Sequence, residues 1–220
     1  MYEQKSTDYF THTRMDIVAA LNGKVFKNVL ELGAGGCDTL IYLKKNGKAT
    51  TVTGIELFEI PNSNQQHSDL DVLHIASIEK IQELPLKTNF YNLVICGDVL
   101  EHVFDPWSVL RFVQSLLTND GMVICSIPNI REFATMKKIF LQGNFAYDLE
   151  GGILDKTHVR FFCKKNIIDL FVKSGYTVNS IEPAFNWAPS QKNRKLANNI
   201  SLGLFEGFLT YQYIVKATRN

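Results

Sequence analysis

Three carboxylates lie at the ends of short apolar runs, where they could line a single site. Glu31, Glu56 and Asp98 each lie in the last residues of such a run or directly after it, and Gly33 and Gly35 interrupt the first run. Parallel strands of an α/β sheet end at one edge, so we expect the three carboxylates to surround one crevice. Glycine lets the backbone turn sharply and lets a ligand approach it closely. The pattern predicts a site for a positively charged ligand.

The glycine spacing distinguishes between two classes of ligand. A dinucleotide fingerprint requires G-x-G-x-x-G, but Asp38 occupies the third glycine position. A pyrophosphate would also meet fixed negative charge at short range, at a cost of about a few kcal/mol when partly desolvated. A ligand with an ammonium, a sulfonium and a ribose diol is favoured, because Glu56 can accept hydrogen bonds from two ribose hydroxyls. An NAD-dependent oxidoreductase is therefore a less favoured alternative.

Apolar runs alternate with helical periods along most of the chain. This alternation predicts an α/β fold with a doubly wound, mostly parallel sheet. The last two strands are expected to pair antiparallel at the sheet edge, residues 142–158 to form a long loop, and residues 184–200 to be irregular. The expected strands are 28–32, 51–55, 72–76, 91–96, 121–127, 177–181 and 209–217, and the expected helices are 8–22, 37–46, 107–118, 131–141 and 164–174.

Composition limits the class of protein. The 220 residues, 45% hydrophobic and 20% charged, fit one globular domain over residues 1–220. A net charge of +1 gives no basic field for nucleic acid, and no apolar run approaches the roughly 18 residues of a membrane span. The four cysteines match no zinc or disulfide spacing, which together with the lack of a signal peptide predicts a cytoplasmic protein. The oligomeric state is not indicated.

Three motifs together resemble class I S-adenosylmethionine-dependent methyltransferases, in the branch that includes quinone-biosynthesis and sugar or cell-envelope pathway enzymes. They are Glu31-Leu-Gly-Ala-Gly35, Gly54-Ile-Glu56 and Gly97-Asp-Val-Leu-Glu-His-Val-Phe-Asp-Pro106. Residues 154–162 also resemble a segment of that branch, and the similarity spans about residues 25–182. The resemblance implies a Rossmann-like sheet of order 3-2-1-4-5-7-6, in which only strand 7 is antiparallel, with helices on both faces.

The resemblance also implies roles for individual residues, with S-adenosylmethionine as the cofactor. Glu31, Gly33 and Gly35 would hold its methionine end. Glu56 would bind the ribose, and Leu57, Ser77 and Ile78 would lie at the adenine; many relatives have an Asp in place of Ser77. Gly97 and Asp98 would lie near the sulfonium and amino group.

Methyl transfer is an in-line displacement, and a hydroxyl acceptor often needs a base. His102 is a candidate for that base, and the alternative is that it braces a turn. In an extended segment, His158 and Arg160 would share one face and suit an anionic or hydroxylated acceptor, unless Arg160 pairs with Asp155. Isolated histidines such as His12 are not assigned to the site.

Further residues are candidates to bind or cover a small-molecule acceptor. Asn129 follows the fifth strand and contacts the acceptor or forms the turn. Tyr147, with Tyr9 and Phe10, covers the site or belongs to the core. We therefore expect residues 1–24 to form a helix and lid, and residues 131–160 to form an acceptor-binding insertion.

A metal site is the less favoured use of the acidic residues after strand four. Asp98, Glu101 and His102 resemble a divalent-metal cluster of some quinone-type relatives, but adjacent residues of a helix point in different directions. We predict no metal. The predicted function is methyl transfer to a small molecule, with a hydroxyl oxygen as the expected acceptor atom. The alternative is a non-catalytic module that binds the cofactor, and a nucleic-acid methyltransferase is disfavoured by the neutral charge.

Overall fold

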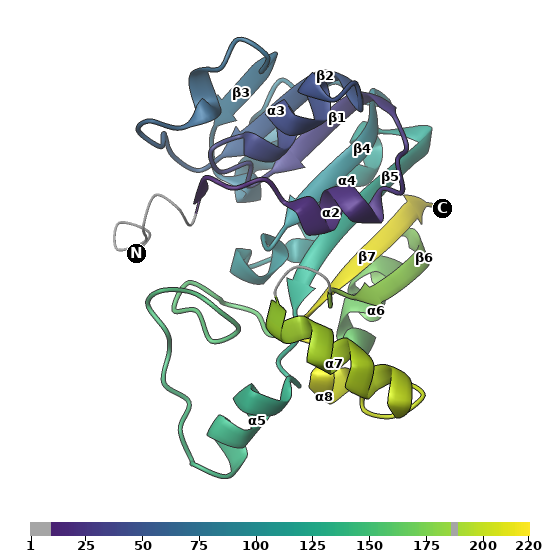
Figure 1. Ribbon diagram of the computed structural model, residues 1–220. Helices are drawn as coiled ribbons and strands as arrows, with labels where there is room; N and C mark the ends of the chain where they lie inside the picture. The colour runs from purple at the N-terminus through teal and green to yellow at the C-terminus, as the bar shows by residue number, and fades with distance from the viewer. Residues whose placement is uncertain (1–9, 186–188) are drawn as a thin grey trace.

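The computed structural model describes residues 10–185 and 189–220. A seven-stranded sheet of order β3-β2-β1-β4-β5-β7-β6 runs through it (Figure 1). The strands are β1 (Phe26–Leu32), β2 (Ala49–Glu56), β3 (Val72–Ile75), β4 (Tyr91–Gly97), β5 (Leu117–Pro128), β6 (Tyr176–Pro183) and β7 (Gln212–Arg219). All neighbours pair parallel except β7, which is antiparallel to both β5 and β6. The predicted fold class and strand order are confirmed.

Helices cover both faces of the sheet. The α-helices are α2 (Met15–Ala20), α3 (Asp38–Lys45), α4 (Pro106–Leu116), α5 (Phe133–Phe140), α6 (Lys164–Lys173), α7 (Pro189–Ile200) and α8 (Glu206–Leu209). Short 3-10 turns are η2 (Asn64–Gln66), η3 (Ile78–Glu83) and η4 (Leu100–His102). Apolar residues of α2 and α3 pack on one face, and those of α4 and α6 pack on the other. The buried strands explain the nearly continuous apolar runs in the sequence.

Local signals set the ends of several elements. Asp105 caps α4 by accepting a hydrogen bond from the Ser108 N–H at 3.0 Å, and Pro106 is its first residue. β1 lies between β2 and β4, so the chain direction across the sheet reverses there. In a doubly wound sheet, this reversal opens a crevice at the carboxyl ends of the strands.

Three predicted elements differ in the structure. The first helix runs only from Met15 to Ala20, and residues 8 and 9 lie outside the described range. Residues 184–200 are not irregular, because 189–200 form α7. That helix is polar nearly all round, so it lacks the apolar period by which helices are recognised. The last strand begins at Gln212, because residues 206–209 form α8.

Candidate active site

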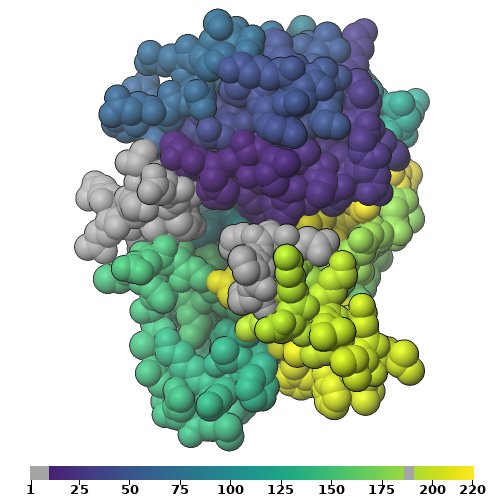
Figure 2. Space-filling model, viewed as in Figure 1, coloured from purple at the N-terminus to yellow at the C-terminus, as the bar shows by residue number. Residues whose placement is uncertain are grey.

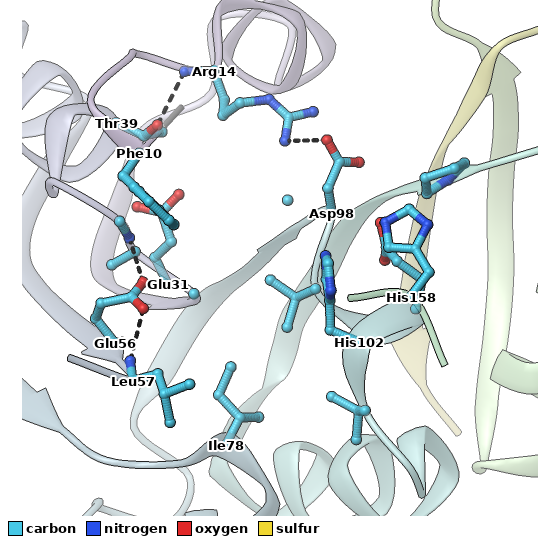
Figure 3. Close-up of a pocket in the computed structure, with 18 of the residues that line it drawn as sticks. Phe10, Arg14, Glu31, Thr39, Glu56, Leu57, Ile78, Asp98, His102 and His158 are labelled. Atoms are coloured by element: carbon cyan, nitrogen blue, oxygen red, sulfur yellow. Dashed lines mark hydrogen bonds and ion pairs between the residues drawn. The ribbon is translucent and has the colours of Figure 1, made fainter. Parts of the chain in front are cut away.

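A cavity of about 510 Å³ opens at the carboxyl edge of the sheet, between the ends of β1, β2 and β4 (Figure 3). The structure brings most of the predicted site residues to it. Those that line the cavity are Glu31, Gly33, Gly35, Glu56, Leu57, Ser77, Ile78, Gly97, Asp98, His102 and His158. The convergence follows from strand order, because the ends of adjacent parallel strands lie side by side.

The turn after β1 requires glycine at two positions. Gly33 has a φ of +66°, and a Cβ atom there would lie 2.5 Å from Cγ2 of Val99. Gly35 has a φ of +52°, and its Cβ would lie 2.5 Å from the Phe10 carbonyl oxygen. Both conformations are strained for other residues, and both positions are closely packed. The N-terminal segment therefore lies directly against the glycine turn.

The amide groups of this turn are used within the protein. The Gly35 N–H donates to Oε2 of Glu56 at 2.7 Å, and the Gly36 N–H donates to the Phe10 carbonyl at 2.8 Å. A phosphate-binding loop instead directs its N–H groups at the ligand. The turn is therefore unsuited to a pyrophosphate, in agreement with the missing third glycine.

Glu56 is held in place but keeps capacity for a ligand. Besides the bond from Gly35, its Oε1 accepts the Leu57 N–H at 2.7 Å. Burial raises the pKa of Glu56, and these two backbone bonds oppose that rise. Because the two oxygens of a carboxylate can accept about four hydrogen bonds, two positions are left for hydroxyl donors.

Glu31 is the most desolvated of the three carboxylates. Its side chain is 3% exposed, and within the described part of the chain Oε2 has no hydrogen-bond partner. Burial raises the pKa of Glu31 to about 8, aided by the charges of Glu56 and Asp38, while Arg14 acts in the opposite direction. A buried acceptor with no partner favours a ligand that brings positive charge or a donor.

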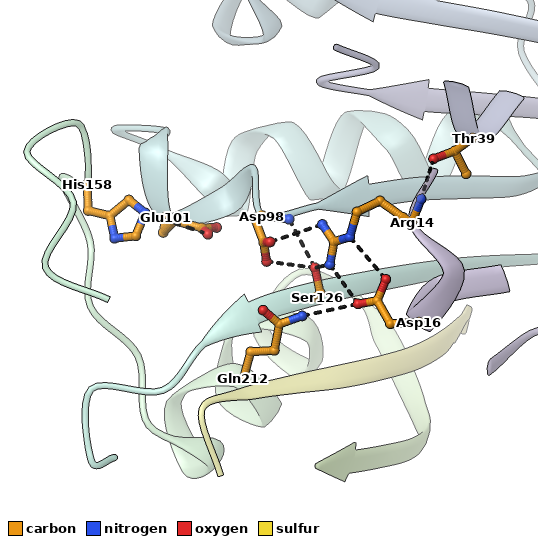
Figure 4. A network of polar contacts seen from close by, with 8 residues as sticks. All are labelled: Arg14, Asp16, Thr39, Asp98, Glu101, Ser126, His158 and Gln212. Carbon is orange, nitrogen blue, oxygen red and sulfur yellow. Dashed lines mark hydrogen bonds and ion pairs between the residues drawn. The ribbon is translucent and has the colours of Figure 1, made fainter. Parts of the chain in front are cut away.

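Arg14, which no sequence motif marks as a site residue, also lines the cavity and points its guanidinium at Asp98 and Asp16 (Figure 4). Its guanidinium contacts Asp98 at 3.0 Å and Asp16 at 2.8 Å, and donates to Oγ of Ser126 at 2.8 Å. The expected cluster of carboxylates is therefore partly neutralised by the protein itself, because Arg14 pairs with Asp98. Glu31 and Glu56 make no ion pair with it, although the Arg14 charge lowers the pKa of Glu31.

Distant segments hold Arg14 in the cavity. Its backbone N–H donates to Oγ1 of Thr39 at 3.1 Å, and Gln212 donates to Asp16 at 3.1 Å. Gly97 makes room for it, since a Cβ there would lie 2.7 Å from Nη1 of Arg14. The sequence could not reveal this arrangement, because these residues come from the N-terminal segment, α3, β4 and β7.

The two candidate catalytic histidines meet at the other end of the cavity. The rings of His102 and His158 are 4.6 Å apart in an edge-to-face arrangement. Nδ1 of His102 lies 3.2 Å from the Thr157 carbonyl, and Nδ1 of His158 lies 3.0 Å from the Ile153 carbonyl. A carbonyl only accepts, so Nδ1 of each ring carries the proton of that contact, and neutral His102 has its lone pair on Nε2. Burial, and then the charge of His158, lowers the pKa of His102 to about 4.

Glu101 completes a cluster with these histidines. It is 1% exposed, both of its oxygens are buried, and Oε1 lies 3.9 Å from Nε2 of His158. Burial raises the pKa of Glu101 well above its ordinary value. One ligand atom from each of Glu101, His102 and His158 lies within 4.8 Å of the others. Glu101 and His102 are neighbours on the short turn η4, and His158 from the long loop supplies the additional group that a site shared by these two residues would need.

Three predicted acceptor residues do not line the cavity. Asn129 is buried and donates to the Gly207 and Thr210 carbonyls, each at 2.8 Å, so it joins two segments. Arg160 donates to the Phe104 carbonyl and packs over the Trp107 ring at 5.3 Å. The N–H groups of Val159 and Arg160 both donate to the Glu101 carbonyl, so the backbone after His158 does not alternate as a strand would. Tyr147 is 52% exposed on the long loop.

Several lining residues lay outside the sequence prediction. Phe10 lines the cavity, as expected for a covering residue, whereas Tyr9 lies outside the described residues. His12 also lines it, although it had been left unassigned. Tyr211, the residue directly before β7, also lines it, and burial raises its pKa to about 12. No local motif marks these residues, since only the antiparallel pairing of β7 with β5 places Tyr211 at the site.

Comparisons with known proteins agree with this geometry. A family model described as a methyltransferase domain matches residues 8–181. A ubiquinone biosynthesis O-methyltransferase of Aeromonas salmonicida is 25% identical over 214 residues, covering 94% of this chain and 87% of that protein. A ubiquinone biosynthesis O-methyltransferase of Pseudomonas entomophila is 33% identical over 109 residues, covering 47% of this chain and 45% of that protein. Most of these curated relatives are matched over about half of their length.

The fold also has solved counterparts. An S-adenosylmethionine-dependent methyltransferase from Archaeoglobus fulgidus superposes with a TM-score of 0.63 at 17% identity, covering 96% of this chain and 97% of that one. Its low identity shows a shared fold. Taken with the match over residues 8–181 and the carboxylate-lined cavity, these findings identify the family. The chain belongs to the methyltransferase-domain family, and it is a class I S-adenosylmethionine-dependent methyltransferase that uses S-adenosylmethionine as its cofactor.

Proposed function

We propose that the enzyme transfers the methyl group to a hydroxyl oxygen of a small molecule. One observation carries the proposal: the same cavity has a buried Glu31 oxygen without a hydrogen-bond partner at one end and two adjacent histidine rings at the other. The first end suits a cationic methyl donor, and the second suits an acceptor that must lose a proton.

At the cofactor end, each group of S-adenosylmethionine has a chemically matched neighbour. Glu31 would hold the ammonium, and Arg14, although already paired with carboxylates, would hold the ligand's carboxylate. Glu56 accepts from the ribose hydroxyls. Leu57, which is 46% exposed at the cavity, and Ile78 pack on the adenine. Asp98, whose charge is shared by Arg14, would lie near the sulfonium.

At the acceptor end, the imidazoles hold and move the proton. With an acceptor bound, Nε2 of His102 would take the proton of its hydroxyl; S-adenosylmethionine would supply an electrophilic methyl group and would leave as S-adenosylhomocysteine. The lowered pKa keeps His102 neutral at pH 7, although it also makes the ring a weak base. Positioning must therefore supply much of the acceleration, because the sulfonium already activates the methyl group. His158 orients the acceptor beside it.

A divalent metal is a second candidate for this end, favoured by the cluster geometry. Glu101, His102 and His158 offer one carboxylate and two imidazoles within 4.8 Å of one another. Both histidines donate Nδ1–H to a backbone carbonyl, as metal-ligating histidines usually do. The donor set fits a first-row transition ion, which would lower the pKa of a bound hydroxyl. Equilibrium dialysis of the protein and of Glu101→Gln against Mn²⁺ or Zn²⁺ tests this assignment.

Formation of S-adenosylhomocysteine tests the proposed reaction. The purified enzyme is incubated with S-adenosylmethionine and a panel of hydroxylated acceptors, with phenols first because the curated relatives are named for ubiquinone biosynthesis. We expect product with a hydroxyl compound, and a loss of about 100-fold for His102→Gln. His67→Gln, a histidine outside the cavity, is the matched control. Cofactor binding without turnover in cell extract would instead support the non-catalytic alternative.

Two finer assignments belong to this proposal. Residues 131–160 shape the acceptor side, supported by Gly152 and His158 in the cavity lining, and the N-terminal segment covers the site, supported by Phe10, His12 and Arg14. We also propose the cytoplasm as the place of action, because all four cysteines are free thiols.

A further inference from the structure

An apolar helix lies exposed at one end of the molecule. α5 has no buried residue, although five of its eight residues are apolar. At its end, Phe140 is 74% exposed and Leu141 is 78% exposed. A group of large exposed apolar side chains on one helix is typical of a contact with a partner or a membrane.

A second apolar projection lies at the turn between α7 and α8. Ile200 is 75% exposed, Leu202 is 95% exposed and Leu204 is 78% exposed. Leu202 also has a positive φ of 50°, a left-handed backbone conformation that bulky residues rarely adopt. Packing against the rest of the described chain does not explain three such leucine and isoleucine side chains.

The two projections belong to one surface. Arg194 of α7 pairs with Glu132 at the start of α5 at 2.6 Å, and Arg131 packs over the Phe208 ring of α8 at 4.7 Å. Figures 1 and 2 show α5, α7 and α8 together at one end of the molecule, beyond the carboxyl end of β5. We call residues 131–145 and 191–208 the apolar–basic end.

This end is positively charged, although the whole chain is nearly neutral. The apolar–basic end contains six basic residues and two acidic ones, whereas the whole chain has 23 basic and 22 acidic residues. Glu132 is paired with Arg194, and Glu206 is paired with Lys164 at 2.6 Å. Along the chain, the next acidic residue after Glu132 is Asp148. The basic residues are Arg131, Lys137, Lys138, Lys192, Arg194 and Lys195.

We propose that the apolar–basic end docks on the surface of an anionic lipid bilayer. Exposed apolar side chains among lysines are what an interfacial contact requires, and the cytoplasmic leaflet is negatively charged. A two-fold dimer through this end would put each lysine cluster against its copy. The projections are separate, which a fluid headgroup layer accommodates without a matching shape. The helices of the described residues include none with the length and hydrophobicity to cross a membrane, so the contact is peripheral.

Co-sedimentation with vesicles tests the proposal, which does not depend on the acceptor. The full chain is mixed with vesicles of phosphatidylcholine alone or with about 40% phosphatidylglycerol, at low and high salt. We expect binding to the anionic vesicles that weakens as salt increases. Lys137→Gln with Lys138→Gln should weaken it about 30-fold. Leu202→Glu with Leu204→Glu should abolish it.

Matched variants at the opposite end separate this surface from general attraction. Lys24→Gln with Lys27→Gln removes the same charge, and Val25→Glu with Val172→Glu adds the same charge at exposed apolar positions. Both should leave vesicle binding unchanged, and a thermal shift with S-adenosylmethionine shows that each variant is folded. Absence of binding to anionic vesicles, or equal losses in the control variants, overturns the proposal. So does self-association in sedimentation velocity that Leu202→Glu with Leu204→Glu removes, since it would assign the surface to a second copy.

Discussion

Glu31 should couple cofactor binding to the release of a proton. In the free protein, burial raises the pKa of Glu31 to about 8, so at pH 7 about nine-tenths of the molecules carry it protonated. The ammonium of S-adenosylmethionine interacts favourably only with the carboxylate form, so binding lowers this pKa. Proton loss must then accompany binding at neutral pH.

The size of the effect follows from the pKa. Relative to a protein in which Glu31 is fully ionised, protonation of Glu31 weakens cofactor binding by about 11-fold, or ~1.4 kcal/mol, at pH 7 and by about 100-fold at pH 6. The dissociation constant should therefore rise about 9-fold between pH 7 and pH 6. The ligand's amino group stays protonated in this range, and His102, with a pKa of about 4, does not titrate there.

Calorimetry measures both quantities. Titrations with S-adenosylmethionine at pH 6 to 7.5, in buffers of different ionisation enthalpy, should report release of about 0.9 proton per ligand at pH 7. Glu31→Gln should bind more weakly, release no proton and show a nearly flat pH profile. Binding without proton release in the natural protein, or an unchanged pH slope in Glu31→Gln, would refute the reasoning.

Three further predictions concern affinity and stability. Glu56→Ala should weaken S-adenosylmethionine binding about 30-fold by calorimetry, whereas His158→Ala should change it by less than about threefold; equal effects would contradict the division into cofactor and acceptor ends. Arg14→Gln should weaken cofactor binding by about 10- to 100-fold and Arg14→Lys by less, and an unchanged affinity would leave Arg14 a purely structural role. Folding raises the pKa of Glu31 from 4.5 to about 8, so the free energy of unfolding falls as pH rises between these values. Glu31→Gln removes this loss and should stabilise the ligand-free protein by about 3 kcal/mol at pH 7, measured by urea unfolding. An unchanged free energy of unfolding would contradict the desolvation of Glu31.

The sequence determined the parts of the fold and site that depend on local order. The apolar run at β1, the glycines after it and the Asp105-Pro106 helix start are encoded within a few residues, so each could be recognised without a structure. The carboxylates at the ends of β1, β2 and β4 were expected to meet, because parallel strands have a common carboxyl edge. Helix α7 was not predicted, because its polar sequence lacks the apolar periodicity by which helices are recognised.

Only the tertiary structure decided which charges and bases meet in the cavity. Arg14 reaches Asp98 across 84 positions of sequence, and His158 approaches Glu101 and His102 from the long loop. The tertiary structure also places Asn129 between two segments, where it hydrogen-bonds to the Gly207 and Thr210 carbonyls and does not line the cavity. Contacts between residues far apart in the chain depend on how elements pack, and residue spacing carries no record of that packing. The sequence therefore specified the place and class of the site, and the packing of distant segments specified its charge balance.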